Sequence, residues 1–197
     1  SVPCPCGTNQ GGRQRQSSSS LSLSKVPLSY QECCLPWHEG IQECTTPLDV
    51  LRTRYTAFAF RDIAHIIATT HASNRDWNKD RIAWAKDLDR NGMFDSMEFV
   101  KLEILNSPAM QQSPQQSQDG TETKDQDVNS SWIEFQVTLR GRDMDNDNDD
   151  DSTTTGQAKV AGLETIIKER SRFLKNPATG VWSYAGGDVT SQVAGLE

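Results

Sequence analysis

The chain has 197 residues, a net charge of −7 and 35% hydrophobic residues, a length that suits one domain with a small appendage. Six aspartates lie between Asp143 and Asp151, so the remaining residues carry a net charge of only −1. They show no basic face of the kind that binds nucleic acid. No apolar run approaches the roughly 18 residues that a membrane span requires. Nucleic acid is therefore not indicated as a partner, and no membrane attachment is expected.

Several segments are too polar to offset the entropy cost of ordering. Residues 7–25 are rich in Ser and Gln, residues 107–131 in Gln, Ser and Asp, and residues 141–157 in Asp and Thr. The tail at residues 187–197 is small and polar. The globular part is therefore predicted to be much shorter than the whole chain and near the usual size of one domain.

Three helices are predicted in the first half of the chain. In the segment 45–60, Thr46 can cap the free amides, Pro47 suits the first helical turn and Asp49 completes a capping box. Apolar residues then recur at helical spacing, which predicts a buried face. Two further helices are expected at residues 61–71 and 74–90.

The hydrophobic period changes to two in the second half of the chain. Ile133, Phe135, Val137 and Leu139 alternate with polar residues, which is typical of a half-buried strand. Four strands are expected in all, at residues 100–105, 131–140, 163–174 and 181–185. Helices followed by strands predict an α+β fold, with three helices packed on one face of a curved antiparallel sheet.

Four of the five cysteines fall in two short stretches, "CPCG" and "ECCLPWHEG". A Cys-x-Cys turn can place two sulfurs on one side of an ion, and two adjacent cysteines can supply the other two. Zinc prefers four such ligands in a tetrahedron. This pattern indicates a zinc site formed by Cys4, Cys6, Cys33 and Cys34. Two disulfides, or thiols that only fill space in the core, are the alternatives.

These residues also resemble a known motif and family. "CPCG" and "SYQECCLPWHEG" look like the SEC-C zinc motif, which typically reads C-P-C-G-S-G-x-x-Y-x-x-C-C. The segments "TPLDVLRTRYTAFAFRDIAHIIATTH", "WIEFQVTL" and "ERSRFLKNPATGVWSYAGG" resemble the YchJ-like proteins. The resemblance implies a zinc knuckle followed by a cone-shaped domain of the nuclear transport factor 2-like (NTF2-like) type.

The resemblance also implies a division of the chain and a set of residues. The zinc knuckle would occupy residues 1–44, the NTF2-like domain 45–186 and a tail 187–197. The four zinc ligands would be the four cysteines already named, with Tyr30 at the aromatic position of the motif and Arg52, Arg54 and Tyr55 in an R-x-R-Y run. The chain departs from the motif in two ways. A Ser- and Gln-rich insertion lengthens the loop between the cysteine pairs, and Leu35 replaces the expected glycine.

Other residues have two open interpretations each. His38 is either a substitute ligand for Cys34 or a hydrogen-bonded neighbour of the site. Cys44 is expected to be a small buried residue rather than a nucleophile. The acidic run Asp143–Asp151 lacks the Gly and Glu positions of a calcium loop, so a solvated acidic loop is expected.

A cone-shaped domain often encloses a pocket, where His65 or His71 could act as a base. Tyr55, Trp77, Trp84, Glu134 and Glu169 are the residues that could join it. The plainer interpretation makes the aromatics core residues and the histidines partly exposed. Arg52 and Arg54 could bind an anion, although pairing with Asp49, Glu32 or Asp62 is the ordinary expectation.

Three functions remain open from the sequence. The first is a non-enzymatic zinc-binding protein whose knuckle docks on another macromolecule. The second is a small-molecule enzyme with a His base in the pocket, and the third is a redox sensor in which Cys33 and Cys34 release zinc on oxidation. A zinc-thiolate site favours a reducing compartment inside the cell. The sequence begins at Ser1 rather than at a methionine, so a fragment or processed chain, with room for a targeting segment upstream, is expected.

Overall fold

The computed structural model describes residues 1–7, 27–107, 128–142 and 162–193. Most of the predicted low-complexity residues, including the acidic run 143–151, lie outside this part. The described helices are α1 (Leu35–His38), α2 (Pro47–Phe60), α3 (Ile63–Ala68), α4 (Arg81–Asp89) and α5 (Met93–Ser96). The described strands are β1 (Met97–Asn106), β2 (Ser130–Gly141), β3 (Glu164–Lys175) and β4 (Trp182–Val193).

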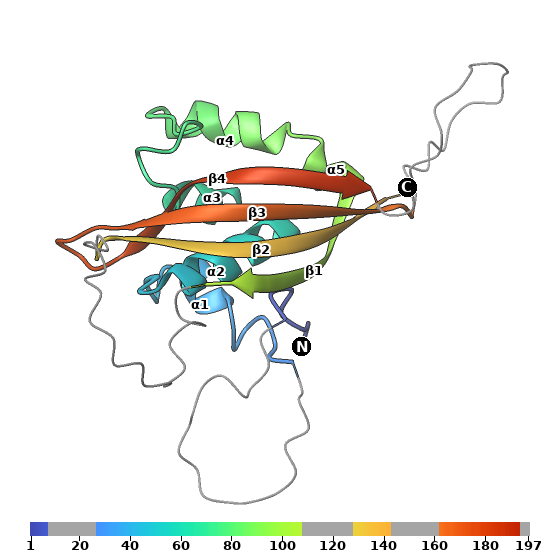
Figure 1. Cartoon of the computed structure of the whole chain (residues 1–197), viewed down its shortest axis with the longest axis horizontal. Coiled ribbons are helices and arrows are strands. Elements are labelled where there is room, and N and C mark those ends of the chain that lie inside the picture. Colours follow the sequence, from blue (N-terminus) through green and yellow to red (C-terminus); the bar gives the residue numbers. More distant parts are fainter. Residues whose placement is uncertain (8–26, 108–127, 143–161, 194–197) are drawn as a thin grey trace, which may run out of the picture.

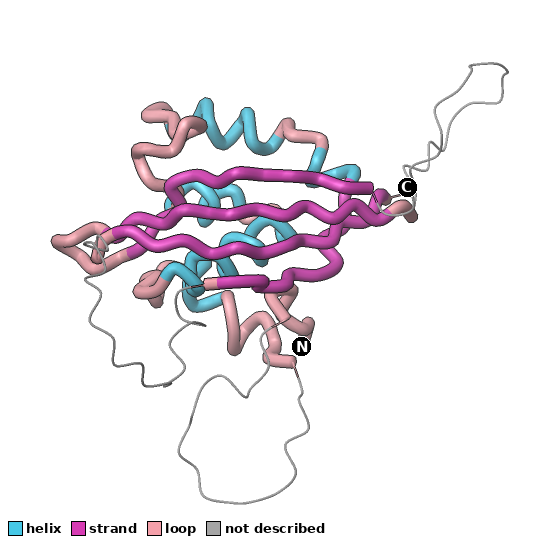
Figure 2. The backbone as a smooth tube through the Cα atoms, viewed as in Figure 1, coloured by secondary structure: helices cyan, strands magenta, loops and turns pink. Residues whose placement is uncertain are grey.

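The four strands form an antiparallel sheet in the order β1-β2-β3-β4. Figure 1 shows α2 and α3 behind this sheet, α1 near the end of β1, and α4 along the β4 edge. The tube in Figure 2 shows the N-terminal loop segment beneath β1. Register shifts interrupt the ladder within β1 and between β3 and β4, and such bulges bend a sheet. The α+β prediction, with helices on one face of an antiparallel sheet, is confirmed.

Helix α2 forms the centre of the molecule. The predicted capping box is present, because the Asp49 amide donates to Thr46 Oγ1 and the Thr46 amide donates to Asp49 Oδ2, each at 3.1 Å. The residues from Thr53 to Ala57 are all buried, so the helix is covered on every side rather than along one stripe. Its different faces therefore contact the N-terminal segment, α3 and the sheet.

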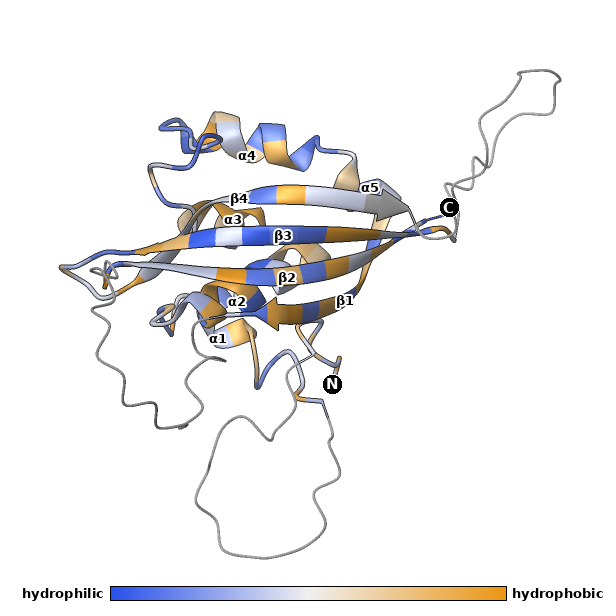
Figure 3. Cartoon of the chain, viewed as in Figure 1, coloured by the Kyte–Doolittle hydropathy of each residue, from blue (hydrophilic) through white to orange (hydrophobic). Residues whose placement is uncertain are grey.

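The core lies between α2 and the inner face of the sheet. On β2, Ile133, Phe135, Val137 and Leu139 are buried, and the residues between them belong to the outer face. Figure 3 shows hydrophobic stretches in β1 and β2 and a hydrophilic stretch in the middle of β3. Among the described helices, none is long and apolar enough to cross a bilayer.

The observed elements differ from the predicted ones in three respects. The third predicted helix, 74–90, is a loop up to Asp80, which then caps α4 by accepting from the amides of Ile82 and Ala83. The short helices α1 and α5 were not predicted. The last strand runs from Trp182 to Val193, well beyond the predicted 181–185, because backbone pairing with β3 continues through the Gly186-Gly187 segment. The division into 1–44, 45–186 and 187–197 stays a prediction.

Candidate metal centre

The sulfurs of Cys4, Cys6, Cys33 and Cys34 lie within 4.8 Å of one another. Cys6 Sγ is 3.5 Å from Cys4 Sγ, 3.4 Å from Cys33 Sγ and 3.8 Å from Cys34 Sγ. Thiolates about 2.3 Å from a tetrahedral zinc ion would stand about 3.8 Å apart, so the cluster already has nearly the right size. All four cysteines are free, and these separations are far longer than a disulfide bond.

Backbone contacts hold the two cysteine stretches together across the long insertion. The Cys4 amide donates to the Leu28 carbonyl and the Tyr30 amide donates to the Val2 carbonyl, each at 2.9 Å. Gly7 has φ +68° and closes the turn by donating to the Cys4 carbonyl. A side chain is strained in this left-handed conformation, which explains a glycine directly after the Cys-x-Cys pair.

The second pair is positioned by a turn that leads into α1. The Cys33 and Leu35 amides both donate to the Tyr30 carbonyl, and Cys34 is the N-cap of α1. Pro36 suits the first turn of this short helix. Leu35, which replaces the glycine of the motif, is an ordinary helical residue here, so this departure does not disturb the turn.

Helix α2 supplies a further contact to the sulfurs. The Thr56 hydroxyl is fully buried, donates to Cys34 Sγ at 3.3 Å and lies 3.7 Å from Cys4 Sγ. A hydroxyl that donates to a thiolate stabilises its negative charge. This contact could not be predicted from the sequence, because Thr56 is distant from the cysteines along the chain and lacks a ligand's chemistry.

The chemistry of the four cysteines suits a cation. Each is at most 8% exposed, so several buried thiolates together would be costly without a positive charge between them. Hydrogen bonds with the Cys33 and Cys34 side chains lower the pKa of the Cys4 thiol to about 7. Hydrogen bonding with Cys33 raises the pKa of the Cys34 thiol instead. A set of close, buried sulfurs with one thiol this acidic is what a metal ion would bind.

His38 is a neighbour of the cluster. Its Nε2 lies 3.0 Å from the Thr53 carbonyl, so this nitrogen carries a proton, while Nδ1 lies 3.0 Å from the Tyr30 hydroxyl and 3.1 Å from Asp62 Oδ2. Both ring nitrogens are therefore engaged with groups other than the sulfurs. His38 links Tyr30, beside the cysteines, to α2 and to the N-cap of α3, and this favours the interpretation as a neighbour over that as a ligand.

Cys44 lies apart from the cluster. It is buried, its Sγ is 3.7 Å from Thr53 Oγ1, and burial raises the pKa of its thiol to about 11. A thiol with a raised pKa is a poor nucleophile. The expectation of a small buried residue is met.

A pocket lies between the helices and the inner face of the sheet, and its lining includes none of the three histidines, all of which belong to the described residues. Of the residues predicted to join a catalytic histidine, Tyr55, Trp84 and Glu169 line the pocket. The other two, Trp77 and Glu134, do not line it, and neither do His65 and His71. Glu134 belongs to the outer face of β2, where it pairs with Arg170. The suggestion of a His base in this pocket is therefore wrong.

The expected pairing of Arg54 with an acidic neighbour is also wrong. Its Nη1 donates instead to the Ile66 carbonyl and to the hydroxyls of Thr69 and Thr70. These partners come from α3 and its C-terminal turn, which the sequence could not place beside α2. Arg54 forms no ion pair with any carboxylate in the described part of the chain.

A family model described as "YchJ, middle NTF2-like domain" matches residues 46–119. The UPF0225 protein of Vibrio parahaemolyticus is 24% identical over 185 residues, covering 93% of this chain and 73% of its own. That of Deinococcus radiodurans is 28% identical over 102 residues, or 52% of this chain and 55% of its own. The match thus spans little more than half of the Deinococcus relative. The similarity to YchJ-like proteins that the sequence indicated is confirmed.

Two solved structures share the fold. A SEC-C motif containing protein from Psychrobacter arcticus has a TM-score of 0.53 at 22% identity, covering 95% of this chain and 82% of that one. A SEC-C motif containing protein from Rhodopseudomonas palustris has a TM-score of 0.51 at 22% identity, and the match covers 83% of this chain and 93% of that one. The domain is therefore NTF2-like, with an N-terminal cysteine cluster compatible with a SEC-C zinc knuckle.

Proposed function

We propose that the chain, an NTF2-like domain of YchJ type behind an N-terminal cysteine cluster, is a zinc-binding protein that acts as an interaction module. In this proposal Cys4, Cys6, Cys33 and Cys34 hold one Zn²⁺ ion as four thiolates. The ion would be structural, because four protein ligands leave no open position for a substrate. The observation that carries the proposal is the convergence of four buried, unbonded sulfurs within 4.8 Å.

Metal analysis tests the zinc assignment. Protein purified without added metal is expected to contain about one zinc per chain, and the cobalt-loaded form should show the visible absorption of a tetrahedral thiolate site. Cys33→Ser should lose most of the metal. Cys44→Ser is the matched control, because Cys44 is an equally buried free cysteine outside the cluster. Equal zinc content in both variants, or no zinc in the wild type, would refute the assignment.

The interaction role rests on exposed apolar residues beside the cysteines. Phe60 is 42% exposed and packs edge-on against Tyr30 at 4.8 Å, and Val2, which is 59% exposed, accepts from the Tyr30 amide. We call Val2, Tyr30 and Phe60 the knuckle patch. Its position depends on the turns that carry the cysteines, so zinc would hold it in shape for a macromolecular partner.

Crosslinking tests the interaction role. A photo-crosslinker at position 2 should capture the same protein from extract of the source cells with the wild type and with Ile82→Ser, a control at an exposed apolar residue on α4. Capture should fail with Phe60→Ser and with zinc-stripped protein. Equal capture by all four samples would contradict a docking role for the knuckle patch.

The redox alternative has less support from the geometry. Oxidation requires an accessible thiolate, yet Cys33 and Cys34 are only 8% and 2% exposed. Zinc should therefore stay bound under mild peroxide. Release under peroxide with recovery by a reductant would favour the sensor instead. A thiolate site of this kind implies a reducing compartment.

A further inference from the structure

The pocket of the NTF2-like domain has a volume of about 360 Å³. Most of its lining is apolar or aromatic, including Leu51, Phe58, Phe99, Phe135 and Ile167. Exposed residues, Asp76 and Val189, also line it, so the pocket opens to solvent beside them. The volume and lining are those of a site for a small organic molecule.

Arg54 brings a positive charge into this apolar pocket. It is 9% exposed, its guanidinium lies 4.6 Å from the Tyr184 ring centre, and burial lowers its pKa to about 10, so it stays protonated near neutral pH. Among the described residues, Nη1 is the one guanidinium nitrogen with hydrogen-bond partners, and these are all neutral. Nε and Nη2 have no hydrogen-bond partner in the described part of the chain. A buried cation with unused donors and no carboxylate partner is costly unless something else pairs with it.

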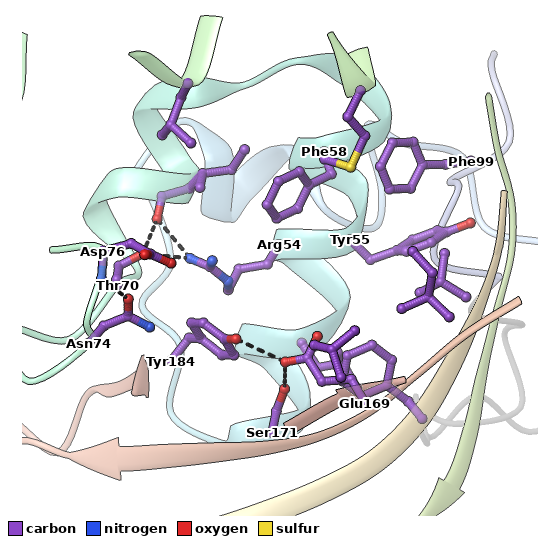
Figure 4. A pocket seen from close by; sticks show the side chains of 18 of the residues that line it. Arg54, Tyr55, Phe58, Thr70, Asn74, Asp76, Phe99, Glu169, Ser171 and Tyr184 are labelled. Atoms are coloured by element: carbon purple, nitrogen blue, oxygen red, sulfur yellow. Dashed lines mark hydrogen bonds between the residues drawn. The ribbon is translucent and has the colours of Figure 1, made fainter. Parts of the chain in front are cut away.

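Glu169 brings an acceptor to the same pocket from β3. The Tyr184 hydroxyl donates to its Oε1 at 2.9 Å, and the Ser171 hydroxyl also donates to Oε1. Figure 4 shows both bonds and shows Arg54 on the adjacent helix within the same pocket. Its Oε2 has no partner among the described residues, so one oxygen remains available to a donor on a ligand.

The absence of a side chain at Gly187 leaves space for the Glu169 carboxylate. A Cβ atom placed on Gly187, the residue opposite Ser171 on β4, would clash with Glu169 Oε1. Any side chain at position 187 would therefore push the carboxylate from its present place. Ser171 and Tyr184 thus hold the Glu169 carboxylate where Gly187 leaves space for it, and the α3 turn holds Arg54.

We propose that this pocket binds a small organic acid with an apolar body and a hydroxyl or amino group. The acid's carboxylate would accept from Nε and Nη2 of Arg54, and the hydroxyl or amino group would donate to Oε2 of Glu169. The apolar body would lie against the aromatic lining. Asp76 also carries a negative charge, but it is exposed at the opening, where water weakens its effect on the interior.

The test measures binding of three matched probes to the full chain by calorimetry. The first is 4-hydroxyphenylacetate, which has every proposed group. The second, 4-hydroxyphenylacetamide, lacks the charge, and the third, phenylacetate, lacks the hydroxyl. We expect the hydroxy acid to bind roughly tenfold more tightly than either of the other two, because each of them loses a charge-assisted hydrogen bond.

Variants assign the two contacts to residues. Arg54→Met should abolish the preference for the acid over the amide. Glu169→Gln and Gly187→Ala should abolish the preference for the hydroxylated acid over phenylacetate, and Gly187→Ala does so without removing a charge. Glu134→Gln, on the outer face of the sheet, is the control and should bind all three probes like the wild type. Near-ultraviolet circular dichroism checks that each variant is folded.

Three results would overturn the proposal. One is the absence of measurable binding of the hydroxy acid. Another is equal affinity for the acid and the amide in the wild type. The third is an unchanged preference in a folded Gly187→Ala or Glu169→Gln protein. None of these results bears on zinc content, so failure of the pocket proposal and failure of the zinc proposal remain distinguishable.

Discussion

Two tyrosines that line the same pocket differ in what their hydroxyls contact. The Tyr184 hydroxyl donates to Glu169, whereas the Tyr55 hydroxyl is buried and has no hydrogen-bond partner in the described part of the chain. Burial raises the pKa of both phenols, so both stay neutral. The two residues have the same chemistry, and the surroundings alone decide whether the hydroxyl stabilises the fold.

Removing each hydroxyl should therefore change stability in opposite directions. Tyr55→Phe is expected to raise the free energy of unfolding by about 1 kcal/mol, because it removes a buried group that lost its water without gaining a partner. Tyr184→Phe is expected to lower it by about 1 kcal/mol, because Glu169 loses a donor. Urea denaturation of both variants measures the change. A loss of stability in Tyr55→Phe would mean that its hydroxyl has a partner after all.

His65 makes the stability of the fold depend on pH. It is 7% exposed and stacks on His38 with ring centres 4.4 Å apart. Burial, helped by His38 and Arg54 and opposed by Asp62, lowers the pKa of His65 from 6.5 to about 4. The unfolded chain therefore binds the proton more tightly. The contribution of neutral His65 to the stability of the folded state is therefore fully present above pH 6.5 and is lost as the pH falls to 4.

This shift corresponds to about 3 kcal/mol of unfolding free energy. Wild type should lose about that much more stability than His65→Phe when the pH falls from above 6.5 to 4. Titrating groups that do not interact with His65, including the cysteines, affect both proteins alike and cancel in the comparison. Urea denaturation at the two pH values gives the difference, and parallel losses in the two proteins would show that His65 does not titrate as described.

The sequence predicted those helices and strands whose position is determined by residues close together in the chain. Thr46, Pro47 and Asp49 marked the start of α2, and the alternation around Phe135 marked β2. The predicted helix 74–90 failed because Asn74 and the residues up to Asp80 form turns through short side-chain contacts that periodicity does not detect. Strand β4 was predicted too short, since pairing with β3 supports a glycine-containing segment that its own composition does not favour.

The capping box of α2 is expected to stabilise the folded protein. Thr46→Ala removes the acceptor of the Asp49 amide and should lower the free energy of unfolding by about 1 kcal/mol. Thr45→Ala, an exposed neighbour outside the helix, is the control and should change it by much less. Chemical denaturation followed by circular dichroism measures both. Equal effects would mean that the cap does not contribute to the stability of the central helix.

The two sites differ in how far the sequence could reveal them. The cysteines could be predicted because ligand chemistry and spacing are visible along the chain. The pocket residues Arg54 and Glu169 had a weaker signal: each is a charged residue in phase with the apolar face of its element, beside Leu51 and Ile167 respectively. Their partners, Thr70 and Tyr184, come from distant segments, so only the tertiary structure brings them together.

At the scale of the molecule, the cysteine cluster and the NTF2-like domain share one core. The four cysteines belong to the same buried cluster as Val50, Leu51, Tyr55 and Phe135. The chain between the cluster and α2 is also tied to the sheet independently of the four clustered cysteines, because the Trp182 amide donates to the backbone carbonyl of Cys44 at 2.8 Å. His38 adds a second tie through the Thr53 carbonyl. The loosening caused by metal loss should therefore be confined to the N-terminal segment, since these hydrogen bonds still hold the chain before α2.

Removal of the proposed zinc ion should thus loosen the N-terminal segment in a graded way. In chelator-treated wild type, or in Cys33→Ser, hydrogen exchange is expected to speed up most at the amides of Cys4 and Tyr30, which depend on the paired cysteine turns. Residues of α1 should respond less, and strands β2 and β3 should keep their protection. The melting temperature should fall, because a ligand that binds only the folded state stabilises it, by about 4 kcal/mol at a thousandfold excess over Kd. Equal loss of protection in β2 and β3 would show that the metal holds the whole domain together rather than its N-terminal segment.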